Sequence, residues 1–499
     1  MQIEIRRRIR DNLYGSIDVS ILEDAVISHP MFQRMRRISQ TAFLNLVFPG
    51  ASHTRLEHSL GVMHLAGLAW AKLKDNQERI RNYCSTYRLF EEREKERGSK
   101  PIQGLLTPSF YEIEGMFSSP YILQTLRLGA LLHDLGHPPF SHSGERFLPS
   151  WESLLEENSH RAHFLKTLIK ERAAKKIPVT HEIFSILMVE DMLKDIYYRH
   201  PSMILKIAAQ DLVSIMVPDV EPLPQSELRK FSALHVCREL ISGEIDIDRM
   251  DYLRRDAKEC GVAYGFFDVD RILDSLALYS NPGDGSIHLA LQYAGLPAFE
   301  DYLRARQSMY AQLYFHKTTA ACEAMLQKIS EYLSSWSLPV SISEYSSIDE
   351  YEIKSILQKE AKNLHKVDQL KLNTLLKDLL VNRNLWKLVY EVTEISTQAS
   401  EETSKNLQIV MDRLKEERLD FELISSRNSL TRLKRIAKDK SSLNHLKLIK
   451  LDERQFLRVE NIEKFTNLTE DTVQYHRIYV NREDAQEAAG YIRDLFEVK

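Results

Sequence analysis

The stretch LGALLHDLGHPPFSH, at residues 128–142 of this 499-residue chain, says most about its fold. It begins as an apolar run with the spacing of a buried helix. The helix is expected to break soon after His133 and Asp134, because Gly136 and the Pro138-Pro139 pair do not continue it. A histidine and an aspartate are therefore presented together at the C-terminal end of a buried helix.

Side chains of this kind are ligands for a divalent metal ion. Successive helical residues lie about a quarter-turn apart, so His133 and Asp134 can reach one ion, and their chemistry suits Mn, Fe or Zn. Two ligands do not complete a site, and FPGASHTRLEHSLGV (48–62) offers His58 as a third. A further carboxylate can come from GEIDIDRMDYLRRD (243–256), where residue type alone leaves four candidates, namely Asp246, Asp248, Asp251 and Asp256.

The composition is that of a globular protein. Hydrophobic residues make up 43% of the chain, charged residues 28%, and the net charge of −4 does not require nucleic acid or an anionic membrane as partner. The four cysteines form no Cys-x-x-Cys pair, which indicates neither a zinc ribbon nor a disulfide framework. MQIEIRRRIR (1–10) is not a secretory signal, and the most hydrophobic stretch (60–71) is too short to span a bilayer. We therefore expect a soluble cytoplasmic protein that binds no membrane.

The fold is predicted to be mainly α-helical. Apolar residues recur mostly at helical spacing, and only HLALQYA (288–294) and RIYV (477–480) have the pattern of strands. His64, in an apolar helix without an acidic neighbour, is interpreted as a core residue and not as a ligand.

Two domains are predicted. Residues 1–340 are expected to form the catalytic core, in which the charged and loop-rich stretch 75–121 is interpreted as an insertion with a solvated helix. Residues 341–499 are expected to form a C-terminal helical lobe with a regulatory or oligomerising role. Within that lobe, EISTQASEETSK (394–405) is typical of a linker, and basic helical segments are expected at 428–440.

Six short sequence motifs, in order, resemble those of the HD-domain deoxynucleoside triphosphate triphosphohydrolases. They are FQRMRRISQ (32–40), FPGASHTRLEHSLGV (48–62), HDLGHPPFSH (133–142), THE (180–182), DIDRMDYLRRD (246–256) and YFHK (314–317). The resemblance includes bacterial dGTPases and the catalytic domain of the vertebrate SAM- and HD-domain enzyme. It implies an HD-domain helical core with a few short strands and a helical C-terminal lobe.

The resemblance also implies a metal site and a reaction. The family's metal ligands are matched by His58, His133, Asp134 and Asp248. The implied reaction is hydrolysis of a deoxynucleoside triphosphate at the α-phosphate, by a metal-activated water, to a deoxynucleoside and inorganic triphosphate. The family's general acid/base, its orienting carboxylate and a third pocket histidine are matched by His142, Glu145 and His181. Without the resemblance, a lone Glu145 would be interpreted as a surface acid.

The substrate contacts carried over by the resemblance concern phosphate and sugar. Phosphate-binding positions are matched by Arg55, His137, Arg249, Arg306 and Lys317, and Mg²⁺ is expected with the triphosphate. Arg249 replaces a lysine of the vertebrate enzyme, so the geometry of its contact differs. Positions that hold the sugar 3′-hydroxyl or pack on the deoxyribose are matched by Gln40, Asp256, Tyr252 and Tyr314. The two tyrosines would otherwise be interpreted as core aromatics.

Two other functions remain open at this point. The chain could be another HD-type phosphohydrolase that acts on single-stranded nucleic acid or on another nucleotide. The basic segment RNSLTRLKRIAKDK (427–440) is the feature that suggests nucleic acid. Alternatively, the chain could be a non-catalytic nucleotide sensor. The residues that match the family's sugar-binding and catalytic positions favour dNTP hydrolysis. The resemblance further implies a homo-oligomer, in which Gln33 and Arg36 match a regulatory nucleotide site. Ser28 replaces that site's guanine-reading acid, so GTP activation is not expected.

Overall fold

The computed structural model describes residues 3–95, 108, 110–281, 284–395, 400–428, 446–451, 457–461 and 473–497. The N-terminal half begins with an antiparallel hairpin and continues as helices. Its elements are β1 (Ile5–Asp11), β2 (Gly15–Ser20), α1 (Ile21–Ser28), α2 (Pro30–Gln33), α3 (Arg55–Lys95), α4 (Phe110–Ser118), α5 (Pro120–Leu132), α6 (Ser141–Gly144), α7 (Trp151–Glu157), α8 (His163–Ala174), α9 (His181–Arg199), α10 (Ala209–Met216), α11 (Glu227–Lys230), α12 (Leu234–Ser242), α13 (Ile247–Cys260) and α14 (Val269–Leu273).

The C-terminal half adds two small sheets and more helices. Its elements are β3 (Leu276–Ser280), β4 (Ile287–Gln292), α15 (Leu296–Met309), a π-helical turn (Tyr310–Tyr314), α16 (Lys317–Tyr332), α17 (Ile342–Tyr345), α18 (Glu350–Glu360), α19 (Lys366–Lys377), β5 (Lys387–Ile395), α20 (Glu401–Glu416), β6 (Phe421–Asn428), β7 (Lys447–Leu451), β8 (Leu457–Asn461), β9 (Val473–Val480) and α21 (Ala485–Glu497).

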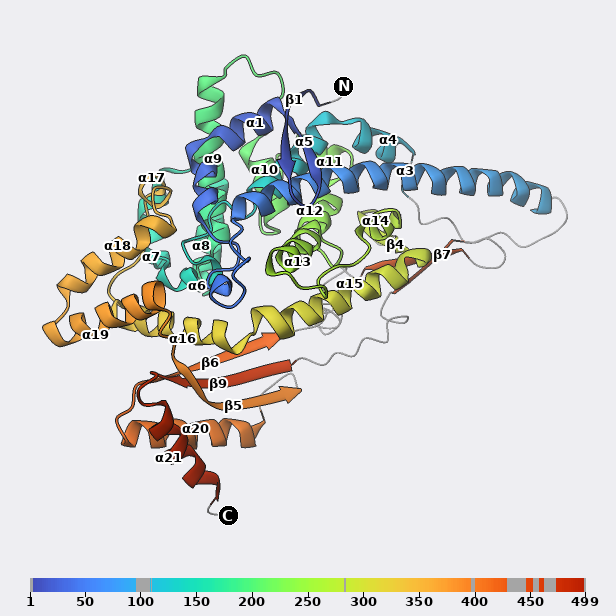
Figure 1. The fold of residues 1–499 in the computed structure, drawn as a ribbon. Helices are drawn as coiled ribbons and strands as arrows, with labels where there is room; N and C mark the ends of the chain where they lie inside the picture. Colours follow the sequence, from blue (N-terminus) through green and yellow to red (C-terminus); the bar gives the residue numbers. More distant parts are fainter. Residues whose placement is uncertain are drawn as a thin grey trace.

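Helices at the centre of the molecule carry the main hydrophobic core. α3 packs against α5 and α13, and α10 packs against α5 and α12, as Figure 1 shows. The apolar faces of these helices bury one continuous cluster of side chains, which supplies most of the hydrophobic stabilisation of this part of the chain. The segments that carry the candidate site are therefore held by a packed interior.

Local signals place the two helix ends that matter for the site. α5 begins at Pro120 because the Ser119 side chain accepts a hydrogen bond from the first turn and proline suits that turn. It then runs to Leu132, so that His133 follows at its C-terminal end. α13 begins after Asp246, whose carboxylate caps it, and Asp248 therefore lies in the first turn.

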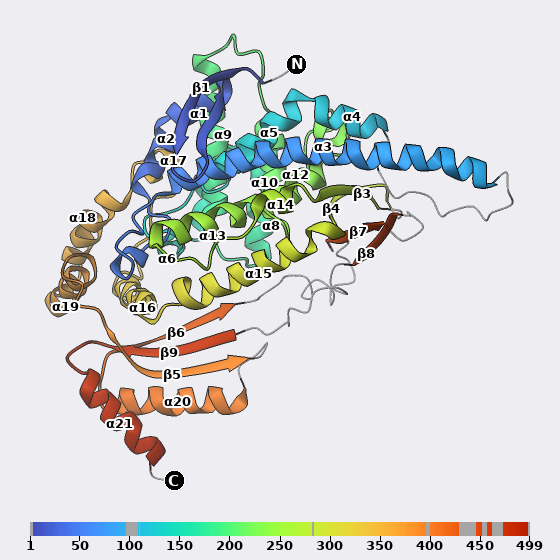
Figure 2. The same cartoon turned by 45° about the vertical axis from the view of Figure 1, so that its right-hand side comes forward.

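The strands form a hairpin and two sheets. In one sheet the order is β3-β4-β7-β8, with β4 parallel to β7, and in the other β9 lies antiparallel between β5 and β6. Figure 2 shows the second sheet below α15 and α16, with α20 and α21 on its far side. A small separate core, which includes Leu407, Val410 and Ile478, fills the space between this sheet and those two helices.

The mainly helical prediction is confirmed, and both predicted strands fall in β4 and β9. The predicted linker at 394–405 is wrong in its second half, because Ser400 caps α20 from Glu401 onward. The C-terminal lobe contains the sheet β5-β9-β6 besides its helices, which the sequence pattern did not predict. The basic segment expected at 428–440 lies outside the described residues after Asn428, the last residue of β6.

The stretch at 75–121 is not a solvated helix throughout. α3 continues without a break to Lys95, and Asn76 is buried in this helix. Its amide donates to the carbonyl oxygens of Leu273 and Leu276, both at 2.9 Å. The first turns of the proposed insertion therefore belong to the packed interior.

Among the described residues, no helix combines the length and apolar character needed to cross a bilayer.

Candidate active site

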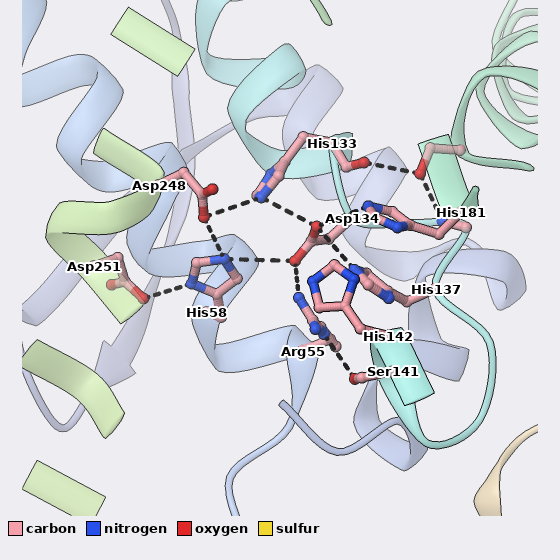
Figure 3. Close-up of polar contacts among 12 residues, drawn as sticks. Arg55, His58, His133, Asp134, His137, Ser141, His142, His181, Asp248 and Asp251 are labelled. Carbon is pink, nitrogen blue, oxygen red and sulfur yellow. Dashed lines mark hydrogen bonds and ion pairs between the residues drawn. The ribbon is translucent and has the colours of Figure 1, made fainter. Parts of the chain in front are cut away.

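Four candidate metal ligands from separate parts of the chain meet at one point (Figure 3). His58 lies on α3, His133 and Asp134 follow α5, and Asp248 lies on α13. His58 Nε2 is 3.0 Å from Asp248 Oδ1 and 3.5 Å from Asp134 Oδ2. His133 Nε2 is 3.3 Å from Asp134 Oδ1 and 3.5 Å from Asp248 Oδ1. The structure thus brings together the four residues expected from the sequence.

Both imidazole rings are oriented with Nε2 toward the carboxylates. His58 Nδ1 lies 2.8 Å from Asp251 Oδ2, and His133 Nδ1 lies 2.8 Å from the Ala130 carbonyl oxygen. Apart from these contacts with the Asp134 and Asp248 carboxylates, the buried Nε2 atoms of the two rings make no hydrogen bond within the described residues. A partner on one ring nitrogen fixes the tautomer and leaves the other nitrogen for a metal. The residues present therefore fit a divalent ion, held by two imidazole nitrogens and two carboxylates.

The charge distribution also suits a cation. Burial opposes ionisation of Asp134, but Arg55 and His133 lower its pKa well below the usual range. Burial also opposes the charged form of His58, but Asp248 and Asp251 raise the pKa of its imidazole to about 10. The carboxylates are therefore ionised in this arrangement, and the His58 ring holds a proton where a metal would bind. A divalent cation would displace that proton, since a ligating histidine is neutral.

A second group of side chains that can bind metal or protons adjoins the first. It consists of His137, His142, Glu145 and His181, and one ligating atom of each lies within 4.8 Å of the others. His181 Nδ1 hydrogen-bonds Glu145 Oε1, whereas His142 Nδ1 is 3.6 Å from the same oxygen. The sequence predicts that Glu145 orients His142. The nearer partner of Glu145 is His181, because α9 begins beside the turn that carries Glu145.

This second group has the character of a proton-transfer site. Burial opposes ionisation of Glu145, but contacts with His142 and His181 lower its pKa overall. The His137 and His181 rings stack with centroids 3.6 Å apart, so their positions are fixed by each other. The His142 side chain is 70% exposed, and it is the member of the group most accessible to a ligand.

A cavity of about 630 Å³ opens over both groups. Its walls include most of the residues that the sequence predicted for catalysis and substrate binding, namely Gln40, Arg55, His133, Asp134, His142, His181, Asp248, Arg249, Tyr252, Asp256, Arg306 and Tyr314. Lys317 is not among its lining residues in the described part of the chain, because it is exposed at the start of α16. Its phosphate contact stays a prediction.

One side of the cavity has the aspartate and tyrosines expected for a sugar. Asp256 Oδ2 accepts a hydrogen bond from the Tyr314 hydroxyl at 2.6 Å, and Oδ1 lies 2.7 Å from His53 Nε2. The Tyr252 and Tyr314 rings are 6.1 Å apart in an edge-to-face arrangement. The Gln40 Oε1 atom is buried there without a hydrogen bond within the described residues, so it can accept one from a ligand.

The arginines around the cavity are held by protein contacts. Arg55 pairs with Asp134, and its Nε donates to Ser141 Oγ at 3.1 Å. Arg249 Nη1 donates to the Gly243 carbonyl at 2.9 Å and lies 3.1 Å from Asp246 Oδ2. The guanidinium of Arg249 is therefore partly committed to the protein, and its contact with phosphate stays a prediction.

Two residues with an orienting role were not assigned from the sequence. Asp251 was one of four acids considered as a ligand, and its position three residues after Asp248 is the signal for a shared helix face. His53 lies in the motif FPGASHTRLEHSLGV (48–62) without a predicted role, and no local pattern links it to Asp256, which is 203 residues away. His64, interpreted as a core residue, packs against Tyr14 with ring centroids 5.1 Å apart, away from the ligands.

The fold and the H…HD…D arrangement show that this chain contains an HD domain. Residues 122–256 match the model of the HD domain, and residues 267–416 match that of the HD associated region. A solved structure, described as a hypothetical protein from Aquifex aeolicus, has a TM-score of 0.60 and 23% sequence identity, and covers 97% of this chain and 99% of its own. That likeness shows a shared fold.

The chain also resembles curated proteins of greater length. The uncharacterized protein YwfO of Bacillus subtilis is 30% identical over 298 residues, which are 60% of this chain and 49% of YwfO. The deoxynucleoside triphosphate triphosphohydrolase SAMHD1 of Bos taurus is 24% identical over 331 residues, which are 64% of this chain and 46% of SAMHD1. The chain spans about half the length of the curated relatives it matches.

Proposed function

We propose that this HD-domain protein hydrolyses deoxynucleoside triphosphates to a deoxynucleoside and inorganic triphosphate. The observation that carries the proposal is that one cavity combines three of the candidate metal ligands, His133, Asp134 and Asp248, with Gln40, Tyr252, Asp256 and Tyr314. Metal ligands alone would serve many phosphohydrolases. An aspartate and two tyrosines beside them suit a nucleoside sugar. The name of SAMHD1 as a dNTP triphosphohydrolase supports the same assignment.

The metal site would be formed by His58, His133, Asp134 and Asp248. A divalent ion bound there, with Mn, Fe and Zn as candidates, polarises a phosphoryl oxygen and lowers the pKa of a bound water. The chain's own residues position the substrate around that site. Asp251 and the Ala130 carbonyl fix the two histidine rings, so that their Nε2 atoms stay directed inward.

Proton transfer falls to the second group. His142 is exposed to the cavity, and we assign it the role of donating a proton to the leaving 5′-oxygen of the sugar. Glu145 stays ionised between His142 and His181 and orients both rings. His181 Nε2 also lies 3.8 Å from Asp134 Oδ1, which connects this group to the metal site.

Phosphate charge would be met by Arg55, Arg249 and Arg306, with Mg²⁺ accompanying the triphosphate. Gln40 Oε1, which makes no hydrogen bond within the described residues, would accept the one hydrogen bond that the sugar 3′-hydroxyl can donate, and Asp256 would lie beside that hydroxyl. The Tyr252 ring, beside Tyr314, leaves little space at C2′, which predicts a strong preference for deoxynucleotides.

The test is the release of inorganic triphosphate from each dNTP, from GTP and from single-stranded DNA by the purified, metal-loaded protein. We expect triphosphate from dNTPs and far less from GTP, with none from the Asp134→Ala control. Equal rates with dGTP and GTP would contradict the sugar assignment. Degradation of single-stranded DNA without triphosphate release would replace this proposal with a nuclease.

A further inference from the structure

A short segment outside the HD motifs lies against the loops that form the candidate site. It connects α17 and α18 and runs from Tyr345 to Glu350. The Tyr345 hydroxyl donates to the Gly136 carbonyl at 2.6 Å. The buried guanidinium of Arg34 donates from Nε to the Ile348 carbonyl at 2.7 Å and from Nη1 to the His137 carbonyl at 2.8 Å. The HD-associated region thus contacts the loop that follows the HD pair.

Glu350 joins two such loops with one carboxylate. Its Oε1 accepts from the backbone N–H of Ser39 at 2.9 Å and of Phe140 at 3.2 Å. Its Oε2 accepts from the Ser39 hydroxyl at 2.6 Å. Ser39 directly precedes Gln40, and Phe140 lies two residues before His142. A single side chain therefore holds the loop of the predicted sugar contact beside the loop of the predicted general acid.

These loops adopt backbone conformations that need external support. Phe140 and Ser141 have φ values of 66° and 51°, and Ala42 has a φ value of 48°. L-residues seldom adopt the left-handed region, and they remain there when surrounding contacts compensate for the strain. The Phe43 and Phe140 rings stack with centroids 5.2 Å apart, but this contact does not engage the backbone N–H of Phe140. Glu350 accepts a hydrogen bond from that N–H.

The contacts continue from Glu350 to the metal site. The Ser141 hydroxyl donates to the Ser39 carbonyl, and Arg55 Nε donates to Ser141 Oγ at 3.1 Å. Arg55 Nη1 in turn pairs with Asp134. A chain of direct hydrogen bonds thus runs from α18 through both loops to a candidate metal ligand.

We propose that Glu350 is a positioning residue, which sets the relative placement of the Gln40 loop and the His142 loop for catalysis. It touches neither the metal ligands nor the cavity, so it acts through Ser39 and Phe140. The kinetic part of this proposal rests on the proposed dNTP hydrolysis. The structural part does not rest on dNTP hydrolysis. It concerns the backbone amides of Ser39 and Phe140, whose hydrogen exchange can be measured without turnover.

The first test compares three variants of the full chain. Glu350→Ala removes all three hydrogen bonds, and we expect kcat/KM per bound metal to fall by about tenfold or more. Glu350→Gln should restore most of the activity, because its amide oxygen accepts from both backbone groups and its N–H can donate to the Ser39 hydroxyl. Glu352→Ala, on the exposed side of the same helix, is the matched control and should behave as the wild type. If Glu350→Ala does not fold, Glu350→Asp, which is one methylene shorter, takes its place.

The second test is hydrogen exchange of the same proteins without substrate. In Glu350→Ala, exchange should accelerate in the peptides that contain Ser39 and Phe140, while metal content stays close to the wild type. Unchanged exchange there, or wild-type kcat/KM in Glu350→Ala, would overturn the proposal, as would loss of metal in proportion to activity. If the wild type hydrolyses no dNTP, the proposed function fails, and the exchange result alone decides the role of Glu350.

Discussion

At the scale of single residues, the site depends on which atom of each side chain is already used. His58 and His133 direct Nδ1 to the protein and Nε2 to the carboxylates, and Asp256 uses both of its oxygens for His53 and Tyr314. A residue's role therefore follows from its unoccupied atoms more than from its type. This distinguishes ligands from orienting residues, and it gives two predictions.

Removing a ligand should remove the metal. In His58→Ala, the site loses one of four donors, and we expect bound metal to fall by at least tenfold and triphosphate release to be abolished. His64→Ala is the matched control, since His64 lies on the same helix and packs on Tyr14. Metal content by elemental analysis decides the outcome. Full occupancy in His58→Ala would show that the ion, if bound, lies elsewhere.

Removing a proton donor should spare the metal. For His142→Ala we expect kcat to fall by about 10²-fold, the scale of general acid/base catalysis, with unchanged metal content. Glu145→Gln should have a similar effect, because it removes the charge that orients His142 and His181. Parallel assays of turnover and metal content test this. Loss of the metal with His142 would make that residue a ligand.

At the scale of elements, helices determine what the site contains. α13 presents Asp248, Asp251, Tyr252 and Asp256 on one face because these positions recur at helical spacing. The sheet β5-β9-β6 packs on α16 and holds the backbone beside Tyr314, since Arg477 donates to the Phe315 carbonyl and the Tyr479 hydroxyl donates to the Lys317 carbonyl at 2.8 Å. The C-terminal sheet therefore supports the wall of the cavity that contains Tyr314.

The packing of β6 on α16 should depend on pH through Glu422. Burial and the neighbouring Glu331 raise the pKa of Glu422 to about 7 from its usual 4.5. The folded state therefore keeps this proton longer than the unfolded state, and the resulting stabilisation is lost as pH rises from 4.5 to 7. Glu422→Gln mimics the protonated form, so it should raise Tm by roughly 2 °C at pH 8 and have little effect at pH 5.

Thermal unfolding at the two pH values measures this effect. Glu416→Gln, at an exposed position on α20, is the control and should show no such dependence. A Glu422→Gln variant that is less stable than the wild type at pH 8 would mean that the contact with Lys328 dominates, with the carboxylate charged.

At the scale of the whole molecule, the residues predicted to form a regulatory nucleotide site bear on whether the protein forms oligomers and whether GTP activates it. Ser28 is exposed at the end of α1, Gln33 donates to the Ile27 carbonyl at 2.6 Å, and Arg36 Nε donates to Gln33 Oε1 at 2.8 Å. Gln33 and Arg36 are thus arranged together, but a serine hydroxyl does not supply the two carboxylate oxygens that read guanine. We propose a homo-oligomer that does not require GTP.

Size-exclusion chromatography with light scattering should show more than one subunit per particle. Initial rates for each dNTP should be within about twofold with and without GTP, because a ligand shifts an equilibrium only if it prefers one state. A fully active monomer would contradict the first statement, and an absolute need for GTP would contradict the second.

Much of this molecule was determined by the sequence alone. The candidate ligands His58, His133 and Asp134 lie in short motifs, whereas Asp248 was chosen among four acids through the family resemblance. The start of α5 follows from a serine and a proline and the start of α13 from an aspartate, because helix capping acts between neighbours in the chain. Helical periodicity gave the mainly α fold for the same reason. At the start of 75–121 and in the second half of 394–405, the polar composition did not indicate that Asn76 is buried or that a capped helix begins at Glu401.

Only the tertiary structure decided which acid serves which histidine and what holds the loops. Asp251 orients His58 across 193 residues, His53 meets Asp256 across 203, and Glu350 binds Ser39 across 311. No periodicity or spacing encodes such pairs, because each depends on how distant helices pack and on which polar atoms are then buried together. The preference of Glu145 for His181 over His142 has the same origin, since it arises where α9 begins against a turn from another part of the chain.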